Sequence, residues 1–114
     1  MNFNSDFRFD LKVGQIKEEE LHEILSNSLI EVKYDLKALE TGNVFVEYES
    51  RGKPSGIATT QSEWYCFAIA ETFHFIKTID LAERCRKYLN SRRDIVGGDD
   101  NTSKGIILPT KELF

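Results

Sequence analysis

The sequence predicts a single α+β domain over residues 1–114, similar to an α/β sandwich, with helices flanking a mixed central β-sheet of about five strands. Three observations lead to this prediction. The chain of 114 residues has the length of one ordinary domain. Hydrophobic residues make up 40% of it and charged residues 30%, as in folded proteins with a core. Segments with strand-like alternation are interspersed with segments that carry a helical apolar stripe.

The first half of the chain predicts one helix and two strands that each have one solvent-exposed face. Residues 7–11 alternate and predict a short strand or an extended arm. Residues 16–26 place their apolar side chains on one helical stripe. Residues 29–35 and 44–50 alternate apolar and charged side chains, which is typical of strands buried on one face. The segment between these two strands is expected to be a loop.

The second half predicts a hairpin, a helix and a last strand. Residues 64–69 are almost all apolar, as in a strand buried on both faces, and residues 72–76 are its expected hairpin partner. Residues 80–90 open with an Asp-x-x-Glu pattern similar to a capping box and continue as a helix. Residues 106–108 form a short final strand that Pro109 ends.

Charge, hydropathy and cysteine content also indicate in which environment the protein is found. The net charge of −4 argues against a protein that coats nucleic acid without specificity. No apolar run approaches the roughly 20 residues that cross a bilayer, so we expect no membrane association. The first residues lack the pattern of a secretion signal, which predicts a cytoplasmic protein. Cys66 and Cys85 are expected to be free, buried thiols.

The two alternating strands carry the candidate chemistry. If they pair as a hairpin with Asp35 opposite Asn43, then Glu31 faces Glu47 at a Cβ separation of roughly 4.5–5.5 Å. Two carboxylates at that distance repel each other unless a divalent cation lies between them, and Mg²⁺ is held by one or two carboxylates with phosphate and water. Lys33, on the same face, is placed to stabilise negative charge on a phosphate or to position a water molecule.

Two other interpretations of these strands stay open. The charged residues are also what the solvent face of an ordinary one-sided sheet carries; they are Glu31, Lys33, Asp35, Glu47 and Glu49. A register shifted by two residues would instead set Lys33 against Glu47 as an ordinary cross-strand ion pair.

The first helix adds two acids to the candidate site. Glu20 falls within its apolar stripe, so that it is directed toward the sheet, and Glu18 lies at the edge of that stripe. Acids aimed at a sheet with other acids predict a metal site or a shared proton. A glutamate that turns outward to solvent is the alternative.

With these residues the chain resembles the PD-(D/E)XK nuclease superfamily, above all its small phage-type and Holliday-junction-resolvase-like members. The likeness lies in the Glu31-x-Lys33 pair, a Thr-Gly-Asn turn, Glu47 on the next strand and the segment SGIATT at residues 55–60. The usual order in that superfamily has an aspartate on the strand before Glu-x-Lys. No strand is expected between the first helix and Glu31, which leaves the individual roles of the acids open. If Glu31 or Asp35 is instead matched to that aspartate and Glu47 to the second acid, Glu49 stands at the position of the lysine and Lys33 lies on the adjacent strand.

The resemblance implies a restriction-endonuclease-like core and a metal-dependent endonuclease that hydrolyses DNA phosphodiesters, including those of branched or structured DNA. It implies Mg²⁺ or Mn²⁺ as cofactor, Lys33 as the catalytic lysine beside Glu31 and Glu47, and a homodimer as one arrangement suited to paired cuts. The implied metal ligands are Glu31, Asp35, Glu47, Glu18 and Glu20. The alternative function is a catalytically inactive module with this fold that binds nucleic acid or a protein partner.

Hydroxyls and cations elsewhere are candidates for contacts with DNA. Hydroxyls in a glycine-containing loop and a run of cations without acids suit a phosphate backbone, although a plain turn and a solvated helix face have the same composition. The candidate residues are Ser55, Thr59, Thr60, Arg84, Lys87, Arg92 and Arg93.

Overall fold

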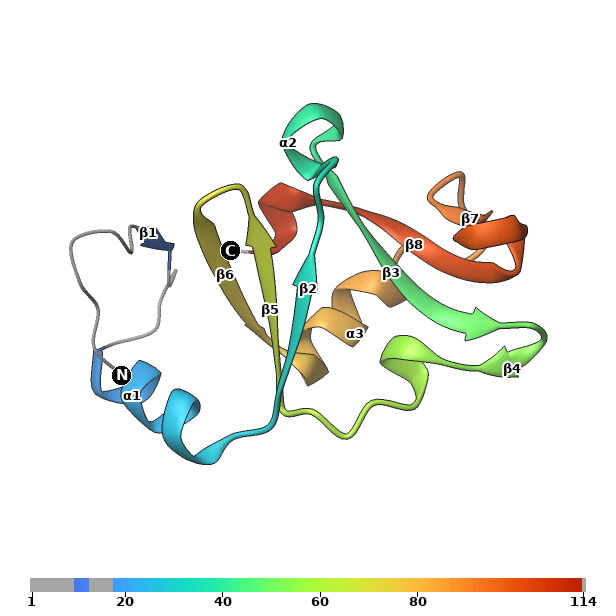
Figure 1. Ribbon diagram of the computed structural model, residues 1–114. Coiled ribbons are helices and arrows are strands. Elements are labelled where there is room, and N and C mark those ends of the chain that lie inside the picture. Colours follow the sequence, from blue (N-terminus) through green and yellow to red (C-terminus); the bar gives the residue numbers. More distant parts are fainter. Residues whose placement is uncertain (1–9, 13–17, 114) are drawn as a thin grey trace.

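The computed structural model describes residues 10–12 and 18–113, which form a compact α+β arrangement of two four-stranded sheets (Figure 1). The strand order is β1-β6-β5-β2 in the first sheet and β4-β3-β8-β7 in the second. The elements in chain order are β1 (Asp10–Lys12), α1 (Glu18–Asn27), β2 (Ile30–Tyr34), α2 (Ala38–Thr41), β3 (Asn43–Ser50), β4 (Lys53–Pro54), η1 (Gly56–Ala58), β5 (Trp64–Ile69), β6 (Thr72–Lys77), α3 (Thr78–Arg86), β7 (Asp94–Gly97), η2 (Asp99–Asn101), β8 (Ser103–Pro109) and η3 (Thr110–Leu113).

The first sheet is mixed and is built around β5. This strand pairs antiparallel with β6 and parallel with β2, while β1 pairs parallel with β6. All six residues of β5 are buried, as its apolar sequence predicts. The β5–β6 hairpin predicted from the sequence is therefore confirmed, and β2 lies at an edge of the sheet.

The second sheet is antiparallel throughout, with β3 and β8 at its centre. The register between β3 and β8 shifts between Glu47 and Glu49, because β3 contains one residue more than β8 at this point. The extra residue is Tyr48, whose hydroxyl donates a hydrogen bond of 2.7 Å to Asp94 Oδ1 at the start of β7. The bulge is thus fixed by a side chain as well as by the backbone.

One hydrophobic cluster joins both sheets to α3 and the C-terminal η3. It contains alternate residues of β5, β3 and β8 and the inward side of α3. Its members are Ala38, Val44, Val46, Tyr65, Phe67, Ile69, Ile76, Leu81, Cys85, Ile106, Leu108 and Leu113. Cys66 and Cys85 are free and buried, as predicted, and burial raises the pKa of the Cys85 thiol to about 12.

Three expectations about the elements are wrong. The strands at residues 29–35 and 44–50 do not form a hairpin, since β2 pairs with β5 and β3 with β8. The segment between them contains the helical turn α2, which buries Ala38 and ends at Gly42 with φ +72°. That turn carries the chain from one sheet to the other. The described chain therefore has two sheets rather than one central sheet, and it includes β7, which the sequence did not predict.

The orientation of β2 also differs from the expectation. Glu31 and Lys33 are in register with Tyr65 and Phe67, whose side chains belong to the core cluster, so the charged face of β2 is the one turned toward the interior. The apolar face carries Val32, which is 51% exposed. Helix α3 begins two residues earlier and ends sooner than predicted, at Thr78 and Arg86. Among the residues that the structure describes, no helix is both long and apolar enough to span a bilayer.

Candidate functional site

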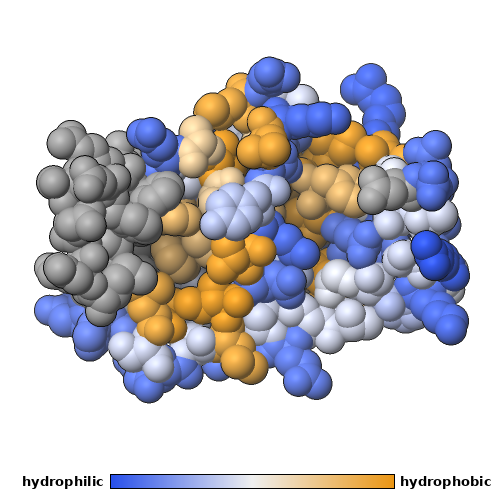
Figure 2. Space-filling model, viewed as in Figure 1, coloured by the Kyte–Doolittle hydropathy of each residue, from blue (hydrophilic) through white to orange (hydrophobic). Residues whose placement is uncertain are grey.

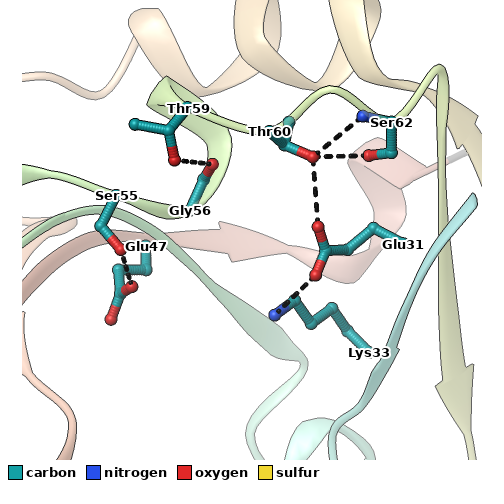
Figure 3. A network of polar contacts seen from close by, with 8 residues as sticks. All are labelled: Glu31, Lys33, Glu47, Ser55, Gly56, Thr59, Thr60 and Ser62. Carbon is teal, nitrogen blue, oxygen red and sulfur yellow. Dashed lines mark hydrogen bonds and ion pairs between the residues drawn. The ribbon is translucent and has the colours of Figure 1, made fainter.

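Two carboxylates and one ammonium group lie where the edge of the first sheet meets the second sheet. Glu31 and Lys33 come from β2 and Glu47 comes from β3 (Figure 3). The bridging segment, residues 55–62, runs between the two strands and contributes hydroxyl groups to both carboxylates. We call Glu31, Lys33 and Glu47 the acid cluster.

Glu47 is held by two serine hydroxyls. Ser55 Oγ donates a hydrogen bond of 2.7 Å to Glu47 Oε2. A hydrogen bond from Ser103, then the one from Ser55, and then the positive charge of Lys33 lower the pKa of Glu47, against the opposing effect of burial. Glu47 is therefore ionised at neutral pH, which a metal ligand or an acceptor of hydrogen bonds requires.

Glu31 is held from the other end of the bridging segment. Thr60 Oγ1 donates to Glu31 Oε1 at 3.1 Å, and Lys33 Nζ lies 3.3 Å from Glu31 Oε2. The position of Thr60 is in turn set by Ser62, whose backbone N–H donates to Thr60 Oγ1 at 3.1 Å and whose hydroxyl lies 2.7 Å from it. One short segment thus fixes a carboxylate of each sheet.

The three charged groups are close enough to influence one another. The Lys33 ammonium points into the space between the two carboxylates (Figure 3), and its charge contributes to the lowered pKa of Glu47. Burial, followed by the charge of Glu31 and with a smaller contribution from Glu47, raises the pKa of Tyr65 to about 12. The charge of Lys33 therefore acts on both carboxylates, and the charges of both carboxylates act on the buried Tyr65.

Gly56 lets the bridging segment approach β3 closely. Its φ is +52°, in the left-handed region that favours glycine, and a Cβ at this position would overlap the carbonyl oxygen of Glu47. The sequence left a turn and a phosphate contact open for the Ser-Gly pair, and the structure adds that Gly56 packs on the backbone of Glu47.

The other predicted acids are placed differently. Asp35 Oδ1 accepts a hydrogen bond of 3.1 Å from the backbone N–H of Lys37, at the entrance to α2. Glu49 lies 3.7 Å from Lys104 Nζ, across the bulge from Glu47. The side chains of Glu18 and Glu20 lie outside the described part of the structure. Within that part, no three His, Cys, Asp or Glu residues are grouped so that they could hold one ion.

The predicted basic run is largely engaged in contacts within the chain. Arg84 donates to the backbone carbonyl of Glu112, and Lys87 forms an ion pair with the Glu112 carboxylate. Arg93 donates to Asn43 Oδ1 at 2.9 Å and to the carbonyl of Ile107 at 3.0 Å. These contacts fix η3 and β8.

Arg92 is exposed, and so is Thr59, whose hydroxyl lies 3.4 Å from the carbonyl oxygen of Gly56. Three residues of the site were missed from the sequence, namely Ser62, Tyr65 and Ser103. The repeated hydroxyls of TTQS were a usable signal for Ser62. Ser103 had none, since it approaches Glu47 only through the pairing of β3 with β8.

Comparisons with family models, with curated proteins and with solved structures found no match to the chain.

Proposed function

We propose that this protein is a metal-dependent endonuclease that hydrolyses DNA phosphodiesters at the acid cluster. One observation carries the proposal: the Lys33 ammonium lies 3.3 Å from the carboxylate of Glu31, and its charge also acts on the carboxylate of Glu47, which belongs to the other sheet. Two carboxylates and a lysine are the groups that hydrolysis of a phosphodiester with a divalent ion employs.

The chemistry of the donors fits Mg²⁺ or Mn²⁺. Mg²⁺ keeps several waters and is bound through one or two protein carboxylates together with the phosphate of the substrate. Glu31 and Glu47 supply that number, and the lowered pKa of Glu47 keeps its carboxylate in the ligand form. When bound, the ion would activate a water molecule and offset negative charge on the phosphate. Asp35 is not included, because its carboxylate is used at the turn before α2.

The residues of this chain have separate roles in the proposal. Glu31 and Glu47 would hold the ion, and Ser55 and Thr60 would keep the two carboxylates oriented through the hydrogen bonds described above. Lys33 would offset charge on the phosphate as the phosphorus–oxygen bond breaks. Its side chain is 51% exposed, so that a strand of DNA can reach it.

The backbone of DNA would be bound by exposed cations rather than by the whole basic run. Arg84, Lys87 and Arg93 contact other parts of the chain, which leaves Arg92 of the predicted DNA-binding cations as the exposed one without such a role among the contacts described. Binding should accordingly be weak and should depend modestly on salt.

Cleavage assays test the proposal. The purified protein would be incubated with linear duplex, single-stranded and four-way DNA in Mg²⁺, Mn²⁺ or EDTA. We expect cleavage with the divalent ions and none in EDTA. Glu47→Gln should lower the cleavage rate about 100-fold or more, because the substituted amide keeps the shape but loses the charge that holds the ion.

Glu71→Gln is the matched control. Glu71 is an exposed glutamate in the turn of the β5–β6 hairpin, at the end of β5 away from the bridging segment, so its removal should leave the rate unchanged. Equal rates for the wild-type protein and Glu47→Gln would identify the activity as contamination.

A second candidate function is a non-catalytic module that binds a nucleic acid or a protein. The observation in its favour is that Lys33 already neutralises Glu31 at 3.3 Å, as an ordinary ion pair on a sheet does. Binding of DNA in a mobility-shift assay without cleavage in any divalent ion would support this candidate against the endonuclease.

A further inference from the structure

The outer edge of β2 is open among the residues that the structure describes. On the edge of β2 that faces β5, the carbonyl of Leu29 accepts hydrogen bonds from the segment leading into β5, and the N–H of Asp35 donates to the carbonyl of Ala68. Backbone groups of alternate residues in a strand point to the same side. Ile30, Val32 and Tyr34 therefore direct their N–H and C=O groups away from β5, where no described strand pairs with them.

An apolar strip runs along the same strand. Val32 is 51% exposed and Tyr34 77%, and Leu36, just beyond the end of the strand, is 93% exposed. Figure 2 shows hydrophobic side chains gathered over the part of the surface where β2 runs. An open edge with an exposed apolar face is a template for pairing with another strand.

The opposite face of β2 carries one charge of each sign. Glu31 and Lys33 stand on either side of Val32 in the sequence, and their side chains are 36% and 51% exposed. A strand with this order is complementary to a copy of itself that runs in the opposite direction.

We infer that β2 pairs antiparallel with β2 of a second copy of this chain, about a two-fold axis at Val32. In that register Val32 pairs with Val32 of the second copy and Ile30 with Tyr34, forming about six backbone hydrogen bonds from the outward groups. Glu31 then lies opposite Lys33 of the other chain, twice in the dimer, as a two-fold contact requires. The apolar strips of the two copies meet on the other face.

The charges select this register. The outward groups belong to Ile30, Val32 and Tyr34, so an alternative register that keeps the hydrogen bonds must shift the axis by one residue along the strand. A shift in one direction sets Glu31 against Glu31 of the second copy, and a shift in the other sets Lys33 against Lys33. Like charges directly opposite each other are destabilising. The register centred on Val32 is favoured over both.

Charge reversal tests the dimer without reference to cleavage, so that its failure is distinct from failure of the proposed function. Sedimentation equilibrium of the wild-type protein should show a monomer–dimer equilibrium. Glu31→Lys and Lys33→Glu should each raise the dissociation constant about tenfold or more, since both cross-strand ion pairs become repulsive. Lys53→Glu, an exposed change on β4, is the control and should not alter it.

Mixing the two single variants gives the sharpest result. In a heterodimer of Glu31→Lys with Lys33→Glu, both cross-strand pairs are again of opposite sign, so a one-to-one mixture should associate about as strongly as the wild-type protein. The double variant with both changes should also dimerise, which covers the case in which a single change impairs folding. A wild-type protein that is monomeric at every concentration would overturn the inference. So would single variants that dimerise normally, or a mixture that stays monomeric.

Discussion

Two clusters of charged side chains in this protein differ in how their charges balance. In the acid cluster, Lys33 stands alone against Glu31 and Glu47. In the second cluster, which we call the Glu112 cluster, Arg84, Lys87 and Tyr88 all donate to Glu112. The acid cluster has an excess of negative charge, whereas in the Glu112 cluster the donors outnumber the acid.

The difference separates a candidate binding site from a structural contact. The Glu112 cluster connects α3 to η3, and every group in it has a partner, so that it needs nothing further from solution. The acid cluster is oriented by neutral hydroxyls, which fix the carboxylates without cancelling their charge. A cation from solution would therefore be attracted to the acid cluster and not to the Glu112 cluster.

The largest expected effect comes from Gly56→Ala. An alanine would have to hold φ near +52° and would overlap the carbonyl oxygen of Glu47, so the bridging segment must move away from β3. We expect the free energy of unfolding to fall by about 1–3 kcal/mol, measured by chemical denaturation. Cleavage should fall as well, because both carboxylates lose their hydroxyl donors.

Gly52→Ala is the control for this change, since Gly52 also has a positive φ, of +79°, but has open space around it. A Gly56→Ala protein with the stability and activity of Gly52→Ala would show that the bridging segment does not depend on its close approach to β3.

Glu112→Gln should affect stability and leave cleavage unchanged. The amide weakens the bonds from Lys87 and Tyr88 that hold η3, and we expect a loss of about 1–2 kcal/mol in the free energy of unfolding. Thermal and chemical unfolding would measure this loss, and the cleavage assay would run beside them. A variant of unchanged stability but lost cleavage would reverse the distinction between the two clusters.

Thr60→Val should separate the effect of orienting the Glu31 carboxylate from the effect of its charge. Valine keeps the shape of threonine but removes the donor to Glu31, which we expect to lower the cleavage rate about tenfold, as loss of a hydrogen bond that orients a ligand does. Thr60→Ser retains the hydroxyl and should restore most of the rate. The Mg²⁺ concentration for half-maximal cleavage should rise for Thr60→Val, whereas a merely structural role would leave it unchanged.

The smallest expected effect is on the acid side of the pH profile. Hydrogen bonds from Lys87 and Tyr88 outweigh burial and lower the pKa of Glu112 below its usual 4.5. A group with a depressed folded pKa adds stability that is present above the unfolded value and is lost as the pH falls through the folded one. The difference in unfolding free energy between wild type and Glu112→Gln should therefore be constant above about pH 5.5 and shrink below pH 4.5. A difference that grows on acidification would contradict the assignment.

The local sequence pattern predicted the individual strands and helices well, but it predicted poorly which strands pair with one another. The six apolar residues of β5 and its hairpin with β6 were predictable, because burial on both faces and a short turn are visible in the sequence. The pairing of β2 with β5 was not, since it joins segments separated by some thirty residues and the alternation of β2 suited a neighbour on either side. The charged face of β2 proved to be the inner one, which its composition alone does not indicate.

The candidate site was predicted from a pairing of strands that the structure does not contain. Glu31 and Glu47 were expected to meet across a hairpin, but β2 and β3 belong to different sheets and the bridging segment joins their carboxylates instead. The residue types were visible in the sequence; the route by which they approach one another depends on tertiary packing. Asp35 shows the limit of the pattern, because it shares the alternation of Glu31 and Lys33 but is used by the backbone of Lys37.

The additional residue in β3 determines what each of two nearby glutamates can do. In a regular strand Glu47 and Glu49, two positions apart, would project alike and share their surroundings. Tyr48 interrupts that regularity, so Glu49 is matched with Lys104 while Glu47 is turned toward Ser55 and Ser103. Deletion of Tyr48 would leave Glu47 opposite Gly105 and Glu49 opposite Lys104, but it would remove the hydrogen bond that ties this point of β3 to Asp94 at the start of β7. Homologous chains that keep the extra residue should therefore also keep an acceptor for its hydroxyl at the position of Asp94.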